Sequence, residues 1–396
     1  MATAVLDLEL NRLPSEISGL ENYVHALILI RLNGRPVGKV SLPVAGGRIG
    51  GAELHTAMID ACGLFLWELW LHERLGWEEG RAEDSAPPAA TVAICTRDRA
   101  EDLGRCLDAL MRLPDDGQEL LVVDNCPSTE ATRELVEKYK RVRYVREDRP
   151  GLNIARNRAL REARHPIVAF TDDDAVPDRG WLRALLRNFD HPLVLCVTGL
   201  TMPLELETPA QEWFERHNPF GKGFKRTVFK GTQTDPLLVG RVGAGVNMAL
   251  RKTAPELVGF FDEALDAGTP THSGGDHEMF SRILMAGYNI IYDPAALSWH
   301  RHRRTWEELR RAVYGYGVGV YALMTRHLLV EGELGVVRLL SGWFLKNQLP
   351  RLLRSLLRRP DSTPRDLLLA ELRGCVAGPR AYFISRKRLR NLKARI

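Results

Sequence analysis

The order of apolar and polar positions sets the first part of the chain, residues 1–85, apart from the rest. Two β-rich runs, 23–32 and 37–44, are joined through an Asn-Gly pair, a dipeptide typical of tight hairpin turns. Leucine and tryptophan then recur at helical spacing over 53–75. A small N-terminal α/β domain, made of a β-hairpin and a helix, is therefore predicted.

From residue 90 onward, short apolar runs alternate with amphipathic helical patterns. A charged and then proline-rich stretch, 78–90, precedes them and is typical of a linker. Strands separated by helices of this length indicate βαβ units and a parallel sheet. The predicted strands are 91–95, 119–123, 142–145 and 167–170, and the predicted helices are 100–112, 129–140 and 152–163.

Polar clusters follow all four predicted strands, and the last cluster consists of Asp172, Asp173 and Asp174. Because parallel strands end at the same edge of a sheet, these clusters should converge where α/β folds hold their ligands. Three adjacent carboxylates repel one another unless a cation or hydrogen bonds compensate them, and hard divalent cations prefer oxygen ligands. We expect Mn²⁺ or Mg²⁺ beside phosphate at this edge, although an isolated Asp triplet would indicate only a solvated acidic turn.

The third stretch, residues 304–396, is basic and helical in pattern. Residues 301–396 hold 21 Lys and Arg against 7 Asp and Glu, a balance of +14 in a chain of net charge +5. Leucines and arginines between Leu349 and Arg358 fall on different faces of a predicted helix. Two interpretations stay open: a surface that binds an anionic membrane, and a helical region that packs its leucines on the core. No RNA-binding motif accompanies the charge, so no nucleic-acid partner is expected.

Composition also bears on location. The six cysteines show no Cys-x-x-Cys spacing and lie mostly in apolar segments, which indicates reduced core residues. The N-terminus lacks the pattern of a signal peptide, and no run of about 18 uncharged apolar residues occurs. We expect a cytoplasmic protein, or one held peripherally at the inner face of the cell membrane, with self-association through the N-terminal domain or the tail left open.

Seven motifs, taken in order, resemble the nucleotide-sugar-binding half and the downstream landmarks of family 2 glycosyltransferases. The resemblance covers roughly residues 91–303 and implies the GT-A fold, with a mixed, mainly parallel central sheet over a domain of residues 90–303. It also implies a nucleoside diphosphate sugar as donor, with a UDP-sugar favoured over GDP- or dTDP-sugars, and a hydroxyl acceptor. The motifs lie at 92–97, 121–125, 150–157, 170–177, 243–251, 259–263 and 274–279.

The resemblance gives individual residues their expected roles. Metal binding falls to Asp172, Asp174 and His300, because alternate residues of an extended chain share one side and a neutral imidazole can complete the shell. The residues expected to bind the donor are Thr96, Arg97, Asp124, Arg156, Asp172 and Asp173.

Asp276 is the expected catalytic base, which would deprotonate the acceptor hydroxyl. Beside bound diphosphate, its pKa is expected to rise above the ordinary carboxyl value, as that of a general base often does. The alternative is an ordinary helix N-cap, since Asp is favoured there. The family pattern has Glu where this chain has Gly275, so one acceptor-side carboxylate is missing, and Glu278 is a weak substitute.

These features predict a metal-dependent inverting glycosyltransferase, a hexosyltransferase by preference, whose acceptor is lipid-linked or a growing glycan. Two other classes stay open. The chain could bind nucleotide sugars without transferring them, in which case Gly275 would mark lost catalysis. A nucleotidyltransferase would also use metal carboxylates on an α/β fold, but no glycine-rich phosphate loop with a lysine follows the first predicted strand.

Overall fold

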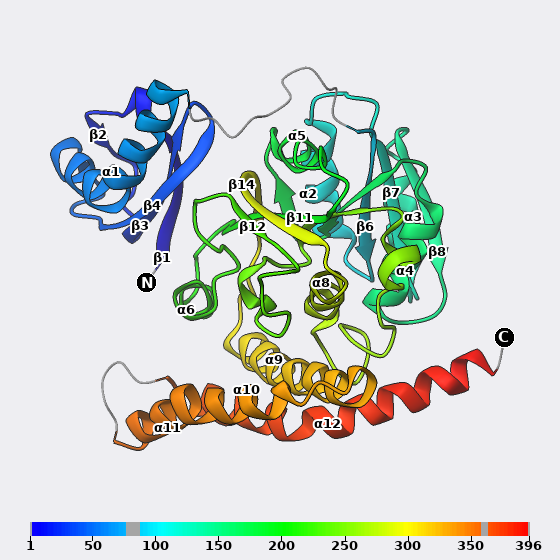
Figure 1. Cartoon of the computed structure of the whole chain (residues 1–396). Coiled ribbons are helices and arrows are strands. Elements are labelled where there is room, and N and C mark those ends of the chain that lie inside the picture. Colours follow the sequence, from blue (N-terminus) through cyan, green and yellow to red (C-terminus); the bar gives the residue numbers. More distant parts are fainter. Residues whose placement is uncertain (1, 77–87, 358–362, 395–396) are drawn as a thin grey trace.

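The computed structural model describes residues 2–76, 88–357 and 363–394. Figure 1 shows an N-terminal domain beside a large central sheet, with a layer of long helices beneath both. The predicted linker at 78–90 lies largely outside the described residues.

The N-terminal domain contains the predicted hairpin and helix, together with a strand that the pattern did not indicate. Strands β3 (Tyr23–Leu32) and β4 (Arg35–Pro43) are antiparallel, and Asn33 and Gly34 take φ of 51° and 76° in the turn, as a two-residue hairpin requires. The additional strand, β1 (Ala2–Glu9), pairs in parallel with β3. Helix α1 (Gly51–Leu75) covers this sheet, and β2 (Glu16–Ile17), η1 (Leu10–Arg12) and β5 (Ile49–Gly50) complete the domain.

The central sheet is mixed, which confirms the predicted α/β class. Its strand order is β10-β14-β11-β13-β9-β6-β7-β8, with β12 paired to β14. The segment β9-β6-β7-β8 is parallel, as predicted, and so is the pair β11–β14, whereas β13, β10 and β12 run antiparallel to their neighbours. The strands are β6 (Ala90–Thr96), β7 (Glu119–Asn125), β8 (Val142–Glu147), β9 (Ile167–Asp172), β10 (Ala175–Pro177), β11 (Val194–Pro203), β12 (Thr227–Phe229), β13 (Asn247–Arg251) and β14 (Asn289–His300).

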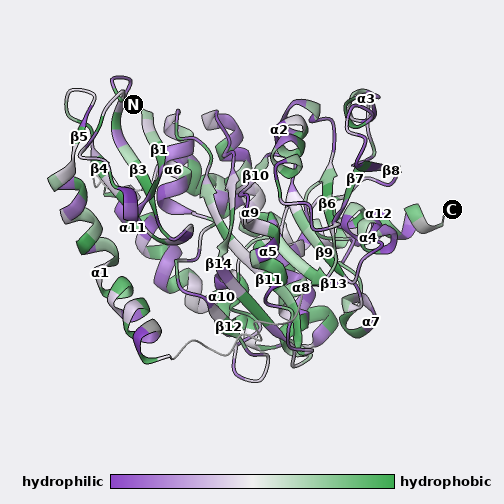
Figure 2. Ribbon diagram, turned by 90° about the horizontal axis from the view of Figure 1, so that it is seen from above, coloured by the Kyte–Doolittle hydropathy of each residue, from purple (hydrophilic) through white to green (hydrophobic). Residues whose placement is uncertain are grey.

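Helices cover both faces of the central sheet because its middle strands are apolar on both sides. Figure 2 shows these strands coloured mainly as hydrophobic. One buried core joins the sheet to α2 (Ala100–Met111), α3 (Ala131–Val136) and α5 (Trp181–Leu186), and another joins it to α4 (Leu152–Glu162) and α8 (Gly275–Met285). Helix α3 is shorter than the predicted 129–140. The remaining short elements are α6 (Pro209–His217), η2 (Val239–Arg241) and α7 (Ala254–Val258).

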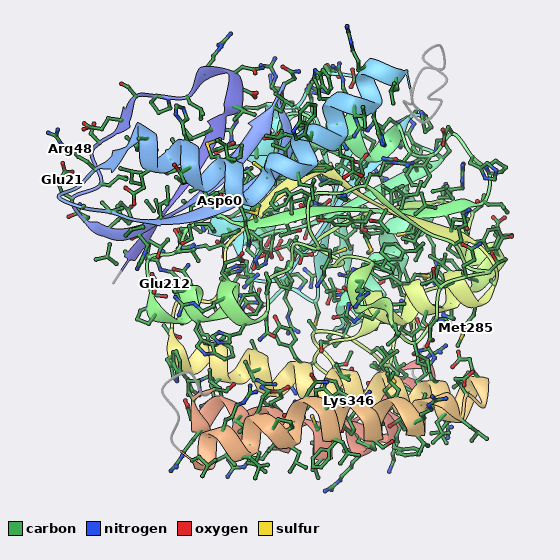
Figure 3. All side chains as sticks on the ribbon, turned by 60° about the vertical axis from the view of Figure 1, so that its left-hand side comes forward. Glu21, Arg48, Asp60, Glu212, Met285 and Lys346 are labelled. Atoms are coloured by element: carbon green, nitrogen blue, oxygen red, sulfur yellow. The ribbon has the colours of Figure 1, made fainter. Side chains whose placement is uncertain are left out.

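The N-terminal domain packs on the outer edge of the central sheet. Leu27 and Leu29 of β3 share a buried cluster with Leu200, Tyr292 and Leu297 of β11 and β14. Polar contacts reinforce this cluster; for example, Thr3 donates a hydrogen bond of 2.6 Å to Glu212 on α6, which Figure 3 shows beneath the N-terminal strands. The domain is therefore integrated with the rest of the molecule through a continuous core.

The C-terminal region is helical, as predicted. Its elements are α9 (Trp306–Arg326), a π-helical turn (His327–Glu331), α10 (Gly335–Trp343), a second π-helical turn (Phe344–Gln348), α11 (Leu349–Leu356) and α12 (Arg365–Lys393). Pro350 sits in the first turn of α11, where a missing N–H costs little. No helix of the described residues is long and apolar enough to cross a membrane.

Glycine allows α9 and α12 to approach each other very closely. A Cβ atom on Gly374 would lie 2.2 Å from the carbonyl oxygen of Tyr314, and one on Gly317 would lie 2.5 Å from that of Glu371. Both positions therefore exclude any side chain. This contact fixes α9 against α12, and α9 in turn packs on the loop that precedes α8.

We predict that Gly374→Ala destabilises the protein, because overpacking a tight contact costs about 1–3 kcal/mol. Gly342→Ala on α10 is the matched control, since nothing lies within 4 Å of its Cβ position and Ala favours a helix over Gly by roughly 0.5–1 kcal/mol. Chemical denaturation should show a lower free energy of unfolding for the first variant and an equal or higher one for the second. Equal stability of the two variants would contradict the packing account.

Candidate active site

A cavity of about 770 Å³ opens at the edge of the sheet where the parallel strands end. Its wall includes Thr96 after β6, Asn125 at the end of β7, and Asp172, Asp173 and Asp174 after β9. Residues from the second half of the chain, among them Asp276 and His300, complete the lining. The polar clusters after β6, β7 and β9 therefore converge as predicted, whereas after β8 the lining begins only at Leu152.

Cationic and hydroxyl side chains surround the Asp triplet. Thr96 donates a hydrogen bond of 2.7 Å to Asp173, and Arg99 contacts Asp173 and Asp174, each at 2.8 Å. Arg303 lies 3.6 Å from Asp174. Arg99 was not predicted as a site residue, although it belongs to the polar cluster that follows the first predicted strand.

The pairing of β10 with β14 brings His300 to the triplet. In this antiparallel ladder Ala175 lies opposite His300, so the histidine is set beside the preceding residue, Asp174. The distance from His300 Nε2 to Asp174 Oδ1 is 3.1 Å. A carboxylate oxygen from Asp172, one from Asp174 and a ring nitrogen of His300 all lie within 4.8 Å of one another.

The three carboxylates have different pKa values because their environments differ. Burial, with the negative charge of Asp174 added, raises the pKa of Asp172 to about 6. Burial also raises the pKa of Asp173, against its contacts with Arg99 and Thr96. The pKa of Asp174 is instead lowered, because His300, Arg99 and Arg303 together outweigh the effect of burial. Asp174 is thus held ionised, whereas Asp172 has too little compensating positive charge nearby.

This donor set fits a divalent cation. Two carboxylates and an imidazole suit Mn²⁺, and the two carboxylates also suit Mg²⁺. Asp173 differs from its neighbours because it lies outside the group of ligand atoms that Asp172, Asp174 and His300 form, and Thr96 and Arg99 contact its two oxygens. The predicted preference for Asp172 and Asp174 over Asp173 as metal ligands therefore has a geometric basis.

Asp276 lies in the first turn of α8 and faces the cavity. Its Oδ2 accepts a hydrogen bond of 2.7 Å from the backbone N–H of Gly245, and its Oδ1 accepts one of 2.8 Å from that of His277. Burial would raise its pKa, but His277, Arg156 and the two N–H groups lower it below the usual value. The raised pKa expected for Asp276 beside bound diphosphate stays a prediction.

Arg156 lies between the two halves of the site. The side chain is buried, and its Nη1 contacts Oδ2 of Asp266 at 2.7 Å. Burial opposes its charge, but Asp266, Asp172 and Asp276 together raise its pKa. Arg156 thus compensates acidic groups from both halves of the chain, and its predicted contact with the donor stays a prediction.

Asp266 is a site residue that sequence reasoning missed. Burial raises its pKa against the opposing effect of Arg156, and its backbone takes a left-handed φ of 84° that non-glycine residues rarely adopt. A Cβ atom on Gly275 would lie 2.5 Å from Asp266 Oδ2 and 2.2 Å from Asn153 Nδ2. The space beside position 275 is therefore already filled, and a carboxylate from another loop stands next to the place of the missing Glu.

Glu278 does not reach the cavity. Its side chain is fully buried and pairs with Arg282 and with Arg326, the latter at 2.9 Å. Two residues along a helix correspond to a rotation of about 200°, so Glu278 points away from the side that Asp276 occupies. This placement argues against the weak acceptor role given to Glu278, and Gly275 offers no side chain at all.

The two remaining residues predicted to bind the donor, Arg97 and Asp124, differ in their exposure. Arg97 borders the cavity with an exposed side chain that lies 3.7 Å from Asp98. Asp124 is fully buried behind the cavity wall, where Tyr144 donates a hydrogen bond of 2.9 Å to Oδ2. Among the described residues none donates a hydrogen bond to its Oδ1, which is buried as well.

Comparison with known proteins identifies the class of this domain. Residues 91–252 match the model of the family Glycosyl transferase family 2. The motifs and the cavity occupy this stretch and the segment that follows it. Residues 91–252 of this chain are therefore similar to the glycosyl transferase family 2.

Curated relatives carry names of the same kind. A pre-mycofactocin glycosyltransferase of Mycobacterium tuberculosis is 31% identical over 233 residues, which cover 57% of this chain and 46% of the relative. A probable glycosyltransferase, YdaM, of Bacillus subtilis is 24% identical over 253 residues, covering 58% and 54%. The chain thus spans about half the length of the curated relatives it matches.

Two solved structures share a looser similarity. A mannosyltransferase from Pyrobaculum calidifontis, in complex with GDP-Man and Mn²⁺, overlaps 83% of this chain and 82% of its own, with a TM-score of 0.44 and 20% identity. GalNAc-T7 with UDP, GalNAc and Mn²⁺ overlaps 68% and 59%, with a TM-score of 0.43 and 14% identity. Neither overlap is close enough to transfer a ligand to this chain.

We predict that Asp174→Asn abolishes high-affinity Mn²⁺ binding, because it removes an ionised ligand oxygen. Asp173→Asn is the matched control, with the same chemical change one residue away in a carboxylate already paired to Thr96 and Arg99. Isothermal calorimetry should show Mn²⁺ binding by wild type and Asp173→Asn and none by Asp174→Asn. Equal binding by the two variants would place the metal elsewhere.

Proposed function

We propose that the chain transfers a sugar from a nucleoside diphosphate sugar to a hydroxyl acceptor, with inversion and with help from a divalent metal. One observation carries the proposal: Asp172, Asp174 and His300 converge in the same cavity as Asp276, which approaches from the opposite half of the fold. A metal–diphosphate site and a carboxylate base in one cavity are what a single displacement needs, because the base must reach the attacking hydroxyl while the metal holds the leaving diphosphate.

The protein groups divide the chemistry between them. A divalent cation held by Asp172, Asp174 and His300 would neutralise charge on the leaving diphosphate. Asp276 would take the acceptor proton, and the two N–H groups that it binds fix the direction of its carboxylate. Arg156 keeps the acidic groups of both walls in place, and Lys222, whose pKa burial lowers, adds a cation on the acceptor side.

A donor panel tests the proposal. The protein is incubated with UDP-, GDP- and dTDP-sugars, with Mn²⁺ or with chelator, and the released phosphates are identified. Free nucleoside diphosphate that appears only with metal supports transfer or donor hydrolysis. Pyrophosphate would instead indicate a nucleotidyltransferase, and donor binding without any release would indicate a protein that binds nucleotide sugars without acting on them.

We predict that Asp276→Asn retains donor binding and loses transfer, since removing a general base costs about 10²–10⁴-fold in rate. Each carboxylate oxygen of Asp276 accepts a hydrogen bond from one backbone N–H group. Asn keeps one of these oxygens and replaces the other with an NH2 group, so only one hydrogen bond is lost and the fold should persist. Donor affinity by calorimetry and turnover by sugar transfer are the two measurements. Near-normal turnover would move the base elsewhere, and Asp266 rather than Glu278 is then the first alternative.

We further propose that the helical region binds an anionic membrane surface. Supporting this, Val337, Leu345 and Leu353 of the α10–α11 segment are at least half exposed, beside the exposed basic residues Arg338 and Lys346. Lys346 is labelled in this layer in Figure 3. Each basic residue near such a surface contributes about 1 kcal/mol.

We predict that the protein co-sediments with vesicles containing phosphatidylserine at low salt, and that added salt releases it because the attraction is screened. Neutral phosphatidylcholine vesicles are the control. Failure to bind the anionic vesicles would leave the helical region as a purely structural part of the protein.

A further inference from the structure

The active-site cavity continues beyond Asp276 into a space between the C-terminal helices. Residues of α9, α10 and α12 line the same cavity as the Asp triplet. On α9 the lining residues are Val313, Tyr316, Val320 and Leu323, whose spacing of three and four puts them on one face of the helix. Trp343 at the end of α10 closes this branch from the other side.

This branch is apolar and still open. Tyr316 and Val320 are 37% and 38% exposed, although both belong to a helix that is packed against α12. The pKa of Tyr316 is raised to about 12 because its ring lies deep in the protein. Side chains that are accessible yet deep mark a pocket that a ligand can enter. Glu371 of α12 also lines the cavity, but its carboxylate is paired with Arg351 and Gln348, so the branch offers a ligand mainly carbon.

An aromatic wall joins the branch to the metal site. The ring of Phe220 lies 5.0 Å from that of His300 and 5.2 Å from that of Phe214, and Phe214 lies 6.2 Å from Tyr316. Phe214 and Phe220 both line the cavity. A molecule whose hydroxyl reaches Asp276 would therefore lay its other end along Phe214 and Tyr316 towards Val320.

We infer that the acceptor of this enzyme carries an apolar group next to the hydroxyl that receives the sugar, and that the branch bounded by Tyr316, Val320 and Trp343 binds this group. The inference rests on the proposed transfer function. A free, fully polar sugar would leave these side chains exposed to water, whereas an alkyl or aryl group would remove them from it. Two sources share this chemistry, an aliphatic lipid portion and an aromatic small molecule.

Binding of simple glucosides to the full chain tests the inference without requiring turnover. Methyl, hexyl and phenyl β-D-glucoside, each below any micelle-forming concentration, are compared by saturation-transfer NMR and titration. We expect the hexyl or phenyl compound to bind at least about tenfold more tightly than the methyl one, as burial of a few carbon atoms implies. Preference for hexyl indicates a lipid-like acceptor and preference for phenyl an aromatic one.

Substitutions in the branch test whether the preference for an apolar glucoside arises there. Val320→Trp should fill the branch and remove the preference, whereas Val376→Trp, at an 82% exposed position on α12 outside the cavity, should retain it. Tyr316→Ala is a second variant that shortens the wall and should weaken binding of the preferred glucoside several-fold, in case Val320→Trp does not fold. Equal binding of the methyl, hexyl and phenyl compounds, no binding of any, or an unchanged preference in Val320→Trp and Tyr316→Ala would overturn the inference.

Failure of the inference is distinguishable from failure of the proposed function. The donor panel reports on metal-dependent release of nucleoside diphosphate and does not involve the branch. Release of nucleoside diphosphate combined with equal glucoside binding would keep the transferase and discard the apolar acceptor. If no nucleoside diphosphate is released but the hexyl or phenyl glucoside is clearly preferred, the apolar binding site would be kept and the transfer function discarded.

Discussion

The structure depends on how the repulsion among three adjacent buried carboxylates is relieved. Two unit charges 4 Å apart near a protein surface repel by about 4 kcal/mol, so Asp172, Asp173 and Asp174 need positive charge from elsewhere. Arg99 supplies it from the same half of the fold and Arg303 from the second half, where His300 also contacts Asp174 at 3.1 Å. The triplet therefore holds the two halves together as well as preparing a metal site.

A second group of charges surrounds Arg156. Arg156 comes from the donor half but pairs with Asp266, and it lies close enough to Asp172 and Asp276 for both to raise its pKa. The loop before α8 is held from below by α9, which can approach because glycine lines that contact. The C-terminal helices thus contribute to the active site by positioning and by lining the cavity, and they are more than an attachment to the catalytic domain.

The parts of the fold that rest on local pattern were predictable, and the parts that rest on long-range pairing were not. Apolar strands followed by polar clusters located one wall of the cavity, because the ends of parallel strands must converge. The contact between Asp174 and His300 depends on the β10–β14 register, and β10 has only three residues. Asp266 lies in a loop at positive φ, for which composition gives no signal, and only coordinates show that it fills the space beside Gly275.

The crowding around Gly275 has a consequence for how this sequence can change. A single replacement that restores the family's Glu at this position would place the new side chain on top of Asn153 and Asp266, both of which are buried and hydrogen-bonded. Recovery of the family pattern would require compensating changes at all three positions, and the intermediates would lose Arg156's partner or overpack the cavity floor. The residue tolerated at position 275 thus depends on the residues at positions 153 and 266. Substitution towards the family pattern one residue at a time would therefore damage the site.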